Sequence, residues 1–302
     1  VTPAMELGVL EVLRQGNMSG TDVTRLFEAK YAKWQGTEYA LAHNTGTAAL
    51  LAAMWACGLG HGDELISPSV TYWASCIQAL TLGASVVFAD IRPDTLNLDP
   101  DDLERRITSR TKAIMVVHYV SMPADMDRIM PIARRHNLKV IEDVSHAQGA
   151  LYKGRKVGTF GDVTAMSLMS GKSLAIGEGG ILCTNDRDLF ERAVLWGHYE
   201  RHGELESEQL RPLAGLPWGT PWLPASRDGR DPDSAAALLC GRILVALAGS
   251  GSKSGLRTAD TPRKKPSVQK ARGPIDVGDA ASVLLPWVYA NPRPPVQGIL
   301  AT

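Results

Sequence analysis

The stretch LKVIEDVS, residues 138–145, places two carboxylates at the end of a short apolar run. Similar apolar runs recur between residues 20 and 200, where they alternate with helical patterns. Near-continuous Val and Ile runs separated by helices indicate a mostly parallel sheet that is covered on both faces. We therefore predict an α/β fold whose chemistry lies at the carboxyl ends of its strands.

The remaining predicted elements follow from the same alternation. Beside 138–145, the predicted strands lie at residues 39–44, 64–69, 84–90, 111–120, 163–170 and 180–186. The predicted helices lie at residues 45–58, from about residue 72, at 124–136 and at 187–199.

The composition is that of a soluble globular protein. Hydrophobic residues make up 44% and charged residues 21% of the chain, and the formal net charge is zero. This balance gives no support for nucleic acid or an anionic membrane as a partner. No apolar run reaches the roughly 18 residues of a membrane span, and no signal peptide opens the chain.

The four cysteines stand far apart and form no C-x-x-C pair. This spacing argues against a zinc site and against a disulfide framework. We therefore expect no metal site, and a protein of a reduced, cytoplasmic compartment.

The sequence changes character after residue 210. Residues 211–302 hold 12 of the 18 prolines and contain no Glu, Phe, Met or His. Residues 1–210 carry 20 Lys and Arg against 26 Asp and Glu, whereas residues 211–302 carry 12 against 6. We predict a large domain over 1–210, and a divergent, truncated or poorly ordered region over 211–302 that is loop-rich from 211 to 270.

Lys172 stands between small residues, just before a glycine-rich turn, in SLMSGKSLAIGEGG (167–180). A phosphate-binding loop would need glycine at position 166, where Met166 stands, and GSGSKSG (249–255) fails the same spacing test. No G-x-G-x-x-G follows a strand, so a dinucleotide-binding fold has no direct support. Taken alone, Lys172 is typical of a solvated loop lysine.

Asp143 changes that interpretation, because it lies where a strand should end. It is either a turn residue that caps the next segment or a carboxylate that keeps a proton on a ring nitrogen, as pyridoxal phosphate requires. His146 follows three residues later and stays near this carboxylate.

Two further segments are compatible with cofactor binding. In HNTGTAALLAAM (43–54) a Gly-Thr turn precedes an Ala-rich helix, whose first amides can bind a phosphate; an ordinary cap by Thr45 or Thr47 is the alternative. Tyr72 follows another strand end, where an aromatic ring either stacks on a cofactor or belongs to the core.

Six segments occur in the order and spacing of one protein family. Together they resemble the DegT/StrS-type sugar aminotransferases, which are fold-type I pyridoxal-phosphate enzymes, over about residues 5–205. The segments are NTGTAAL (44–50), GHGDELISPSVTYWAS (60–75), ADIRPDTLNLDP (89–100), RTKAIMVVHYVSMPADMD (110–127), VIEDVSHAQGALYKGRKVGTFGDV (140–163) and SLMSGKSLAIGEGGILCTND (167–186).

The resemblance implies roles around the cofactor ring. Lys172 resembles the lysine that holds pyridoxal phosphate as a Schiff base and later carries a proton. Asp143 resembles the partner of the pyridine nitrogen, and His146 matches a position, Gln or His, that approaches the ring hydroxyl. Tyr72 is similar to the aromatic residue that stacks on the ring.

The resemblance also implies the phosphate site and the reaction. Gly46, Thr47 and Ala48 match the phosphate turn, and Ser167 matches a serine that binds the phosphate. The implied activity moves an amino group from glutamate or glutamine to a keto-sugar, nucleotide-linked or cyclitol-like, in a homodimer whose sites lie at the subunit interface.

Two alternatives and three departures accompany this interpretation. A sugar dehydratase of the same fold would have histidine in place of Lys172, and a non-catalytic, cofactor-binding protein is the other alternative.

Ser121 stands where family members usually have glycine in a substrate-side loop, and LMSG (168–171) replaces a bulkier stretch. Residues 211–302 show no match to the family.

Overall fold

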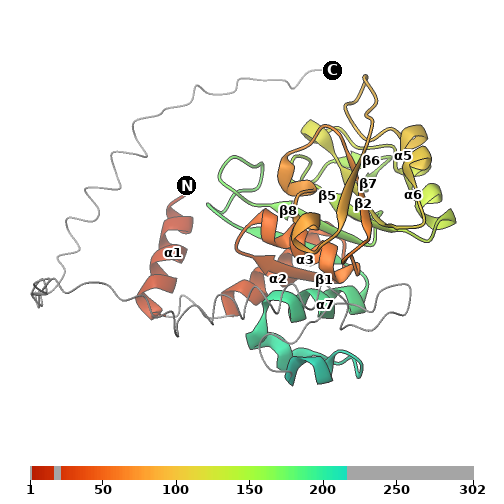
Figure 1. The fold of residues 1–302 in the computed structure, drawn as a ribbon. Helices are drawn as coiled ribbons and strands as arrows, with labels where there is room; N and C mark the ends of the chain where they lie inside the picture. The colour runs from red at the N-terminus through yellow and green to blue at the C-terminus, as the bar shows by residue number, and fades with distance from the viewer. Residues whose placement is uncertain (1, 17–21, 216–302) are drawn as a thin grey trace, which may run out of the picture. The chain divides into compact units, whose positions relative to one another are not determined.

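The computed structural model describes residues 2–16 and 22–215. In this part of the chain a seven-stranded sheet has the order β1-β9-β8-β5-β4-β2-β3 (Figure 1). Strand β9 is antiparallel to β1 and β8, and the other neighbouring strands are parallel. The strands are β1 (Tyr39–His43), β2 (Glu64–Pro68), β3 (Ser85–Ala89), β4 (Thr111–Val117), β5 (Lys139–Asp143), β8 (Val163–Ser167) and β9 (Gly180–Thr184).

Helices cover both faces of this sheet. One face packs against α3 and α7, and the other packs against α2, α5 and α6. The helices are α1 (Pro3–Gln15), α2 (Asp22–Gln35), α3 (Gly46–Ala56), α4 (Gln78–Thr81), α5 (Pro100–Arg106), α6 (Met126–Arg135) and α7 (Arg187–Gly197). Short 3-10 segments are η1 (Trp73–Ser75), η2 (Tyr119–Ser121), η3 (Tyr199–Glu204) and η4 (Arg211–Gly215), and β6 (Leu151–Tyr152) and β7 (Arg155–Lys156) form a hairpin.

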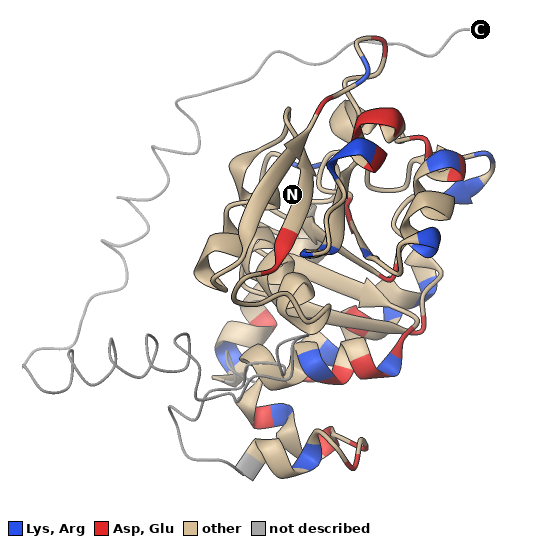
Figure 2. Cartoon of the chain, turned by 45° about the vertical axis from the view of Figure 1, so that its right-hand side comes forward, with Lys and Arg blue, Asp and Glu red and all other residues tan. Residues whose placement is uncertain are grey.

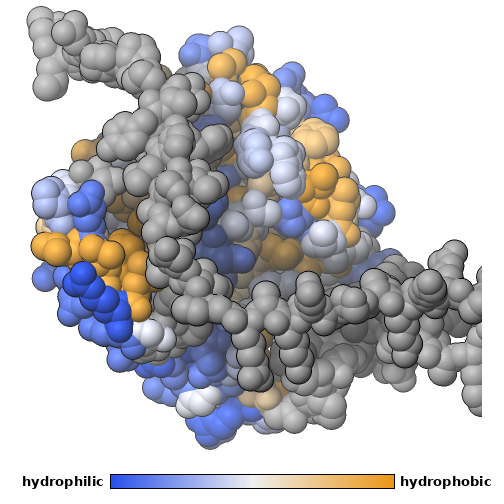
Figure 3. All heavy atoms as spheres, turned by 90° about the vertical axis from the view of Figure 1, so that its left-hand side faces the viewer, coloured by the Kyte–Doolittle hydropathy of each residue, from blue (hydrophilic) through white to orange (hydrophobic). Residues whose placement is uncertain are grey.

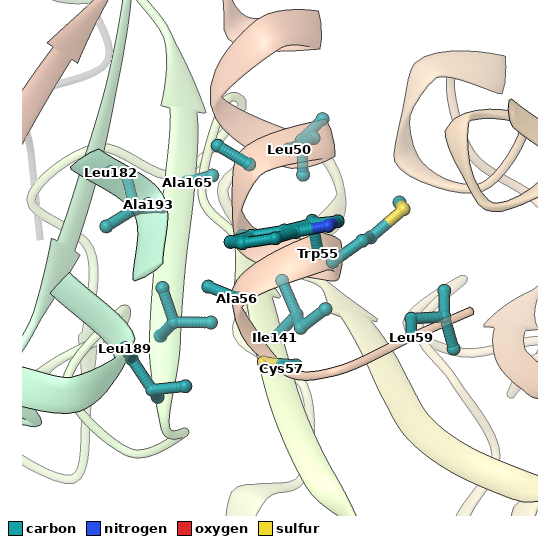
Figure 4. Packing of buried hydrophobic residues seen from close by; sticks show 14 of the residues in the cluster. Leu50, Trp55, Ala56, Cys57, Leu59, Ile141, Ala165, Leu182, Leu189 and Ala193 are labelled. Atoms are coloured by element: carbon teal, nitrogen blue, oxygen red, sulfur yellow. The ribbon is translucent and has the colours of Figure 1, made fainter. Parts of the chain in front are cut away.

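Helix α3 forms the centre of the largest core cluster (Figure 4). Its alanines let it pack closely on β8 and β9, while Leu50 and Trp55 fill the space toward neighbouring elements. The Trp55 ring lies 5.3 Å from that of Trp196 on α7. A helix that is apolar on nearly all sides must be buried, and this burial fixes the position of its first turn relative to the sheet.

The prediction of a mostly parallel, helix-covered α/β sheet is confirmed, and each predicted strand has a counterpart. The prediction of a helix from about residue 72 is wrong, because a 3-10 turn at η1 and the single turn α4 occupy this region. Thr71 donates through Oγ1 to Ser75 Oγ (2.8 Å), so these side chains bond locally in a way that competes with a regular helix. The prediction for 211–302 lies almost entirely outside the described residues.

Lys and Arg alternate with Asp and Glu along the same helices in the view of Figure 2. Cys57, Cys76 and Cys183 are buried free thiols. In the described part, no helix is both long and apolar enough to cross a membrane, and no group of side chains could hold a metal ion.

His43 ends β1 and packs its ring against that of His198, which follows α7, with centroids 5.0 Å apart and planes at 75°. Its Nε2 is buried without a hydrogen-bond partner among the described residues. Burial, and to a lesser degree His198, lowers the pKa of His43 to about 3. The folded chain therefore keeps this imidazole neutral.

This pKa predicts acid sensitivity. The pKa of His43 is lower in the folded chain than in the unfolded chain. Below about pH 6.5 the unfolded chain therefore binds a proton at His43 that the folded chain does not bind, and the free energy of unfolding falls as the pH falls. We expect His43→Phe to reduce the loss between pH 7 and pH 5 by on the order of 1–2 kcal/mol, measured by urea unfolding. The exposed His136 is the control, and an equal pH dependence of His43→Phe and His136→Phe would contradict the prediction.

Candidate active site

The carboxyl ends of four parallel strands meet at one edge of the sheet. Strand β1 leads into the first turn of α3, β8 ends at Ser167, β5 ends at Asp143, and β4 leads into η2. Residues that are far apart in the sequence are therefore neighbours at this edge, as expected for an open α/β sheet.

Asp143, the last residue of β5, is a buried acidic group whose two carboxylate oxygens are both hydrogen-bonded. It is 5% exposed, its Oδ2 accepts a hydrogen bond from Ser75 Oγ (2.7 Å), and its Oδ1 accepts one from the Ser145 N–H (3.0 Å). Both oxygens are thus fixed in orientation, which suits a carboxylate that must meet a partner from a defined direction. Sequence reasoning missed Ser75 and Ser145, although the Ser145 bond is a local Asx turn, in which an Asp carboxylate accepts the N–H of the second residue after it.

His146 lies within electrostatic range of both this carboxylate and Lys172. Lys172 is half-buried in a turn closed by its N–H donating to Met169 O (2.9 Å). Burial, and then the positive charge of Lys172, lower the pKa of His146, whereas the charge of Asp143 opposes this shift. His146 is thus close enough to interact electrostatically with both Lys172 and Asp143.

Gln148 connects the lysine turn to the sheet. Its Nε2 donates to Ser167 O (2.7 Å), and its Oε1 accepts the Leu174 N–H (2.6 Å). One amide side chain therefore links the end of β8 to the segment just after Lys172. Sequence reasoning did not identify this residue.

The first turn of α3 presents backbone amides at the same edge. Thr45 caps the helix, because its Oγ1 accepts the Ala48 N–H (3.1 Å) and its carbonyl accepts the Ala49 N–H (3.1 Å). The amides of Gly46 and Thr47 precede these bonds and are the donors that a helix leaves for an anion. The cap and the anion-binding interpretation are therefore compatible.

Two glycines let this turn lie directly on the sheet. A Cβ on Gly46 would lie 2.7 Å from Ser167 Cα, and a Cβ on Gly180 would lie 2.2 Å from the carbonyl oxygen of Thr45. Gly180 is also the register partner of both His43 and Ser167. The predicted phosphate turn and Ser167 are thus in direct contact, and Gly180 is a site residue that sequence reasoning missed.

Tyr72 and Ser121 lie in the loops around this edge. Tyr72 is 58% exposed, and its ring packs on Trp73 at 5.2 Å. Ser121 has a φ of 66°, the left-handed conformation that favours glycine, and its Oγ donates to His146 O (2.7 Å). The stacking role of Tyr72 stays a prediction.

The arrangement fits pyridoxal phosphate. The turn at Gly46 offers amides beside the Ser167 hydroxyl for a phosphate, Asp143 offers a fixed carboxylate, and Lys172 offers an amine. The side-chain chemistry and the close glycine contacts therefore agree with the predicted cofactor.

Comparison with known proteins agrees with this geometry. The profile of the DegT/DnrJ/EryC1/StrS aminotransferase family matches residues 4–213. GDP-perosamine synthase of Caulobacter vibrioides is 49% identical over 163 residues, which are 54% of this chain and 44% of that protein. L-glutamine:2-deoxy-scyllo-inosose aminotransferase of Streptomyces fradiae is 41% identical over 197 residues, 63% of this chain and 46% of that protein.

A solved structure is similar over the same region. Spr1654 of Streptococcus pneumoniae, in its PLP form, has a TM-score of 0.61 and 28% identity, covering 65% of this chain and 55% of that one. The chain spans about half the length of the curated relatives it matches.

The contact between Gly46 and Ser167 can be tested by adding one methyl group. We expect Gly46→Ala to lower the free energy of unfolding by about 1–3 kcal/mol, because the new Cβ meets backbone that cannot move aside cheaply. Gly197→Ala is the control, since Gly197 ends α7 with open space around it. Urea unfolding of the full chain measures both, and equal stability of the two variants would show that the turn is loosely packed.

Proposed function

The chain belongs to the DegT/DnrJ/EryC1/StrS aminotransferase family, and from this premise we propose that it acts as a pyridoxal-phosphate-dependent sugar aminotransferase. In the proposed reaction an amino group moves from glutamate or glutamine to a keto-sugar. The observation that carries the proposal is the contact of the Gly46 turn with Ser167, whose N–H donates to the Ser145 hydroxyl (2.9 Å) beside Asp143. The relatives' names support the substrate class, since one contains a GDP-linked sugar and another glutamine and an inosose.

Asp143 would hold the cofactor's ring nitrogen. Pyridoxal phosphate, when bound, supplies an aldehyde that takes up the amino group and a ring that withdraws electrons while its nitrogen is protonated. Asp143 would keep that proton in place, because Ser75 and Ser145 fix both of its oxygens. His146, three residues further, would lie beside the ring hydroxyl.

Lys172 would have two tasks. Its Nζ would bind the cofactor covalently until the amino donor displaces it. The freed amine would then accept the proton from the donor's α-carbon and deliver it to the carbon on the other side of the transferred nitrogen, a 1,3 shift. Because donor and acceptor would use one site in turn, ping-pong kinetics would follow.

The phosphate would be held by donors from two elements. Gly46 and Thr47 would donate from the start of α3, and Ala48 continues this turn. Ser167 would add its hydroxyl from the end of β8. The close packing of Gly46 on Ser167 supports this shared role, because it brings the hydroxyl to the helix terminus.

Two alternatives predict different behaviour. A sugar dehydratase of this fold is disfavoured because Lys172 occupies the position of its histidine. A cofactor-binding protein without turnover would bind pyridoxal phosphate but would not react with glutamate or glutamine. A half-reaction with each donor, followed by the loss of visible absorbance, separates these alternatives.

We also propose a homodimer in a reducing, cytoplasmic compartment. Apolar side chains are exposed around the site, on Tyr72, Trp73, Val120, Met122 and Ile176. Figure 3 shows hydrophobic patches among hydrophilic residues on one face of the molecule. Exposed apolar patches of this kind favour burial against another subunit, and the buried free cysteines fit a reducing compartment.

Removal of the Lys172 amine tests the covalent role. We expect Lys172→Ala to lose the visible absorbance of the lysine-bound cofactor and all transamination, because no other amine takes its place. Borohydride reduction followed by peptide mapping should place the label on Lys172 in the unaltered chain. Lys30→Ala, an exposed change on α2, should behave like the unaltered chain. An intact absorbance band in Lys172→Ala would refute the assignment.

Asp143→Asn tests the carboxylate without changing its size. The variant should still bind the cofactor, but the glutamate half-reaction should slow about a hundredfold or more, because a neutral amide cannot hold the ring nitrogen protonated. Stopped-flow absorbance measures this rate. A rate within twofold of the unaltered chain would remove Asp143 from the mechanism.

A further inference from the structure

The loop of residues 119–123 combines strain with a position at the site. Val120 has a φ of 47° and Ser121 a φ of 66°, although neither is glycine. A β-branched residue in the left-handed region is rare and persists only where the surroundings hold it. The loop follows β4, directly beside the strand that ends at Asp143.

Asn97 holds both ends of this loop. Its side chain is buried, with 1% of the residue exposed. Its Oδ1 accepts the Tyr119 N–H (2.9 Å), and its Nδ2 donates to the carbonyl oxygens of Met122 (3.0 Å) and Pro123 (3.3 Å). One amide therefore satisfies three backbone groups that the strained loop cannot pair internally.

The held loop contacts His146 in two places. The Tyr119 ring lies 5.7 Å from the His146 ring between centroids. Ser121 Oγ donates to the carbonyl oxygen of His146 at 2.7 Å. The ring and backbone of His146 are thus both fixed by residues of the loop that Asn97 closes.

We propose that Asn97 is a positioning residue for amino transfer, which fixes His146 through Tyr119 and Ser121. This inference rests on the proposed function of the same site. Asn97 lies outside the reacting groups and acts through the loop alone. Without the three hydrogen bonds of Asn97, the loop relaxes from its left-handed conformation. The His146 ring then loses its fixed position at the site.

The structural test uses the ligand-free, full-length chain. Asn97→Asp keeps the acceptor for Tyr119 but replaces the donor to Met122 and Pro123 with a carboxylate oxygen. Amide hydrogen exchange at residues 119–122 should become at least about tenfold faster. Asn137→Asp is the matched control, because Asn137 also has a left-handed φ (51°) but lies exposed before β5. Unchanged exchange rates in Asn97→Asp would show that Asn97 does not hold this loop.

The functional test uses the chain loaded with pyridoxal phosphate. At equal content of lysine-bound cofactor, Asn97→Asp should lose most of the visible circular dichroism and slow the glutamate half-reaction about tenfold. Ser121→Ala, which removes only the bond to His146, should act in the same direction. The double variant should lose less than the product of the two single losses, because both act through one loop.

The outcomes separate this inference from the proposed function. Wild-type dichroism and rate in Asn97→Asp overturn the positioning role while the proposed function stands. A loss that matches the fraction of unfolded chain, measured by thermal unfolding, also overturns it. If the unaltered chain reacts with neither glutamate nor glutamine, the proposed function is overturned, and so is the role of Asn97 in amino transfer. Hydrogen exchange still tests whether Asn97 holds the loop of residues 119–123.

Discussion

Glu142 is the buried charge on which the site edge depends. It has no exposed surface, and it meets His118 Nε2 (2.9 Å) and the N–H groups of Gly158, Phe160 and Gly161. Burial alone would raise its pKa, but His118 and the backbone donors outweigh burial and lower the pKa of Glu142 below its usual range. A single carboxylate therefore attaches the segment after β4 and the turn before β8 to β5, immediately beside Asp143.

The site is built mainly by close backbone contacts between the first turn of α3 and the strands β8 and β9. Gly180 leaves room for the carbonyl of Thr45, and Gly46 leaves room for Ser167, so that α3 begins directly on the sheet. Side chains then connect the separate segments, with Ser75 reaching Asp143 from 68 residues away. These close contacts explain why the phosphate turn is built from small residues. Each added side-chain atom would push the start of α3 away from β8.

The strands and the candidate site residues at their ends could be identified from the sequence, because apolar runs and polar strand ends are local signals. Asp143 at the end of its run and Lys172 before a glycine-rich turn are examples, given the ordered set of motifs around them. Ser75, Gln148 and Asn97 could not be predicted in the same way. Their roles depend on partners that only the folded sheet brings near, and the same side-chain bonds near Ser75 explain why the helix expected from residue 72 is absent.

Ser121 shows how a departure in sequence can be reconciled with the fold. The family resemblance implies glycine here, and the φ of 66° is a conformation that glycine adopts without cost. A serine in this conformation costs on the order of 1–2 kcal/mol, which must be offset locally. Its hydroxyl bond to His146 and the three bonds of Asn97 to the same loop supply that compensation. Ser121 is therefore bonded to the backbone of His146, and Asn97 holds the same loop on both sides of Ser121.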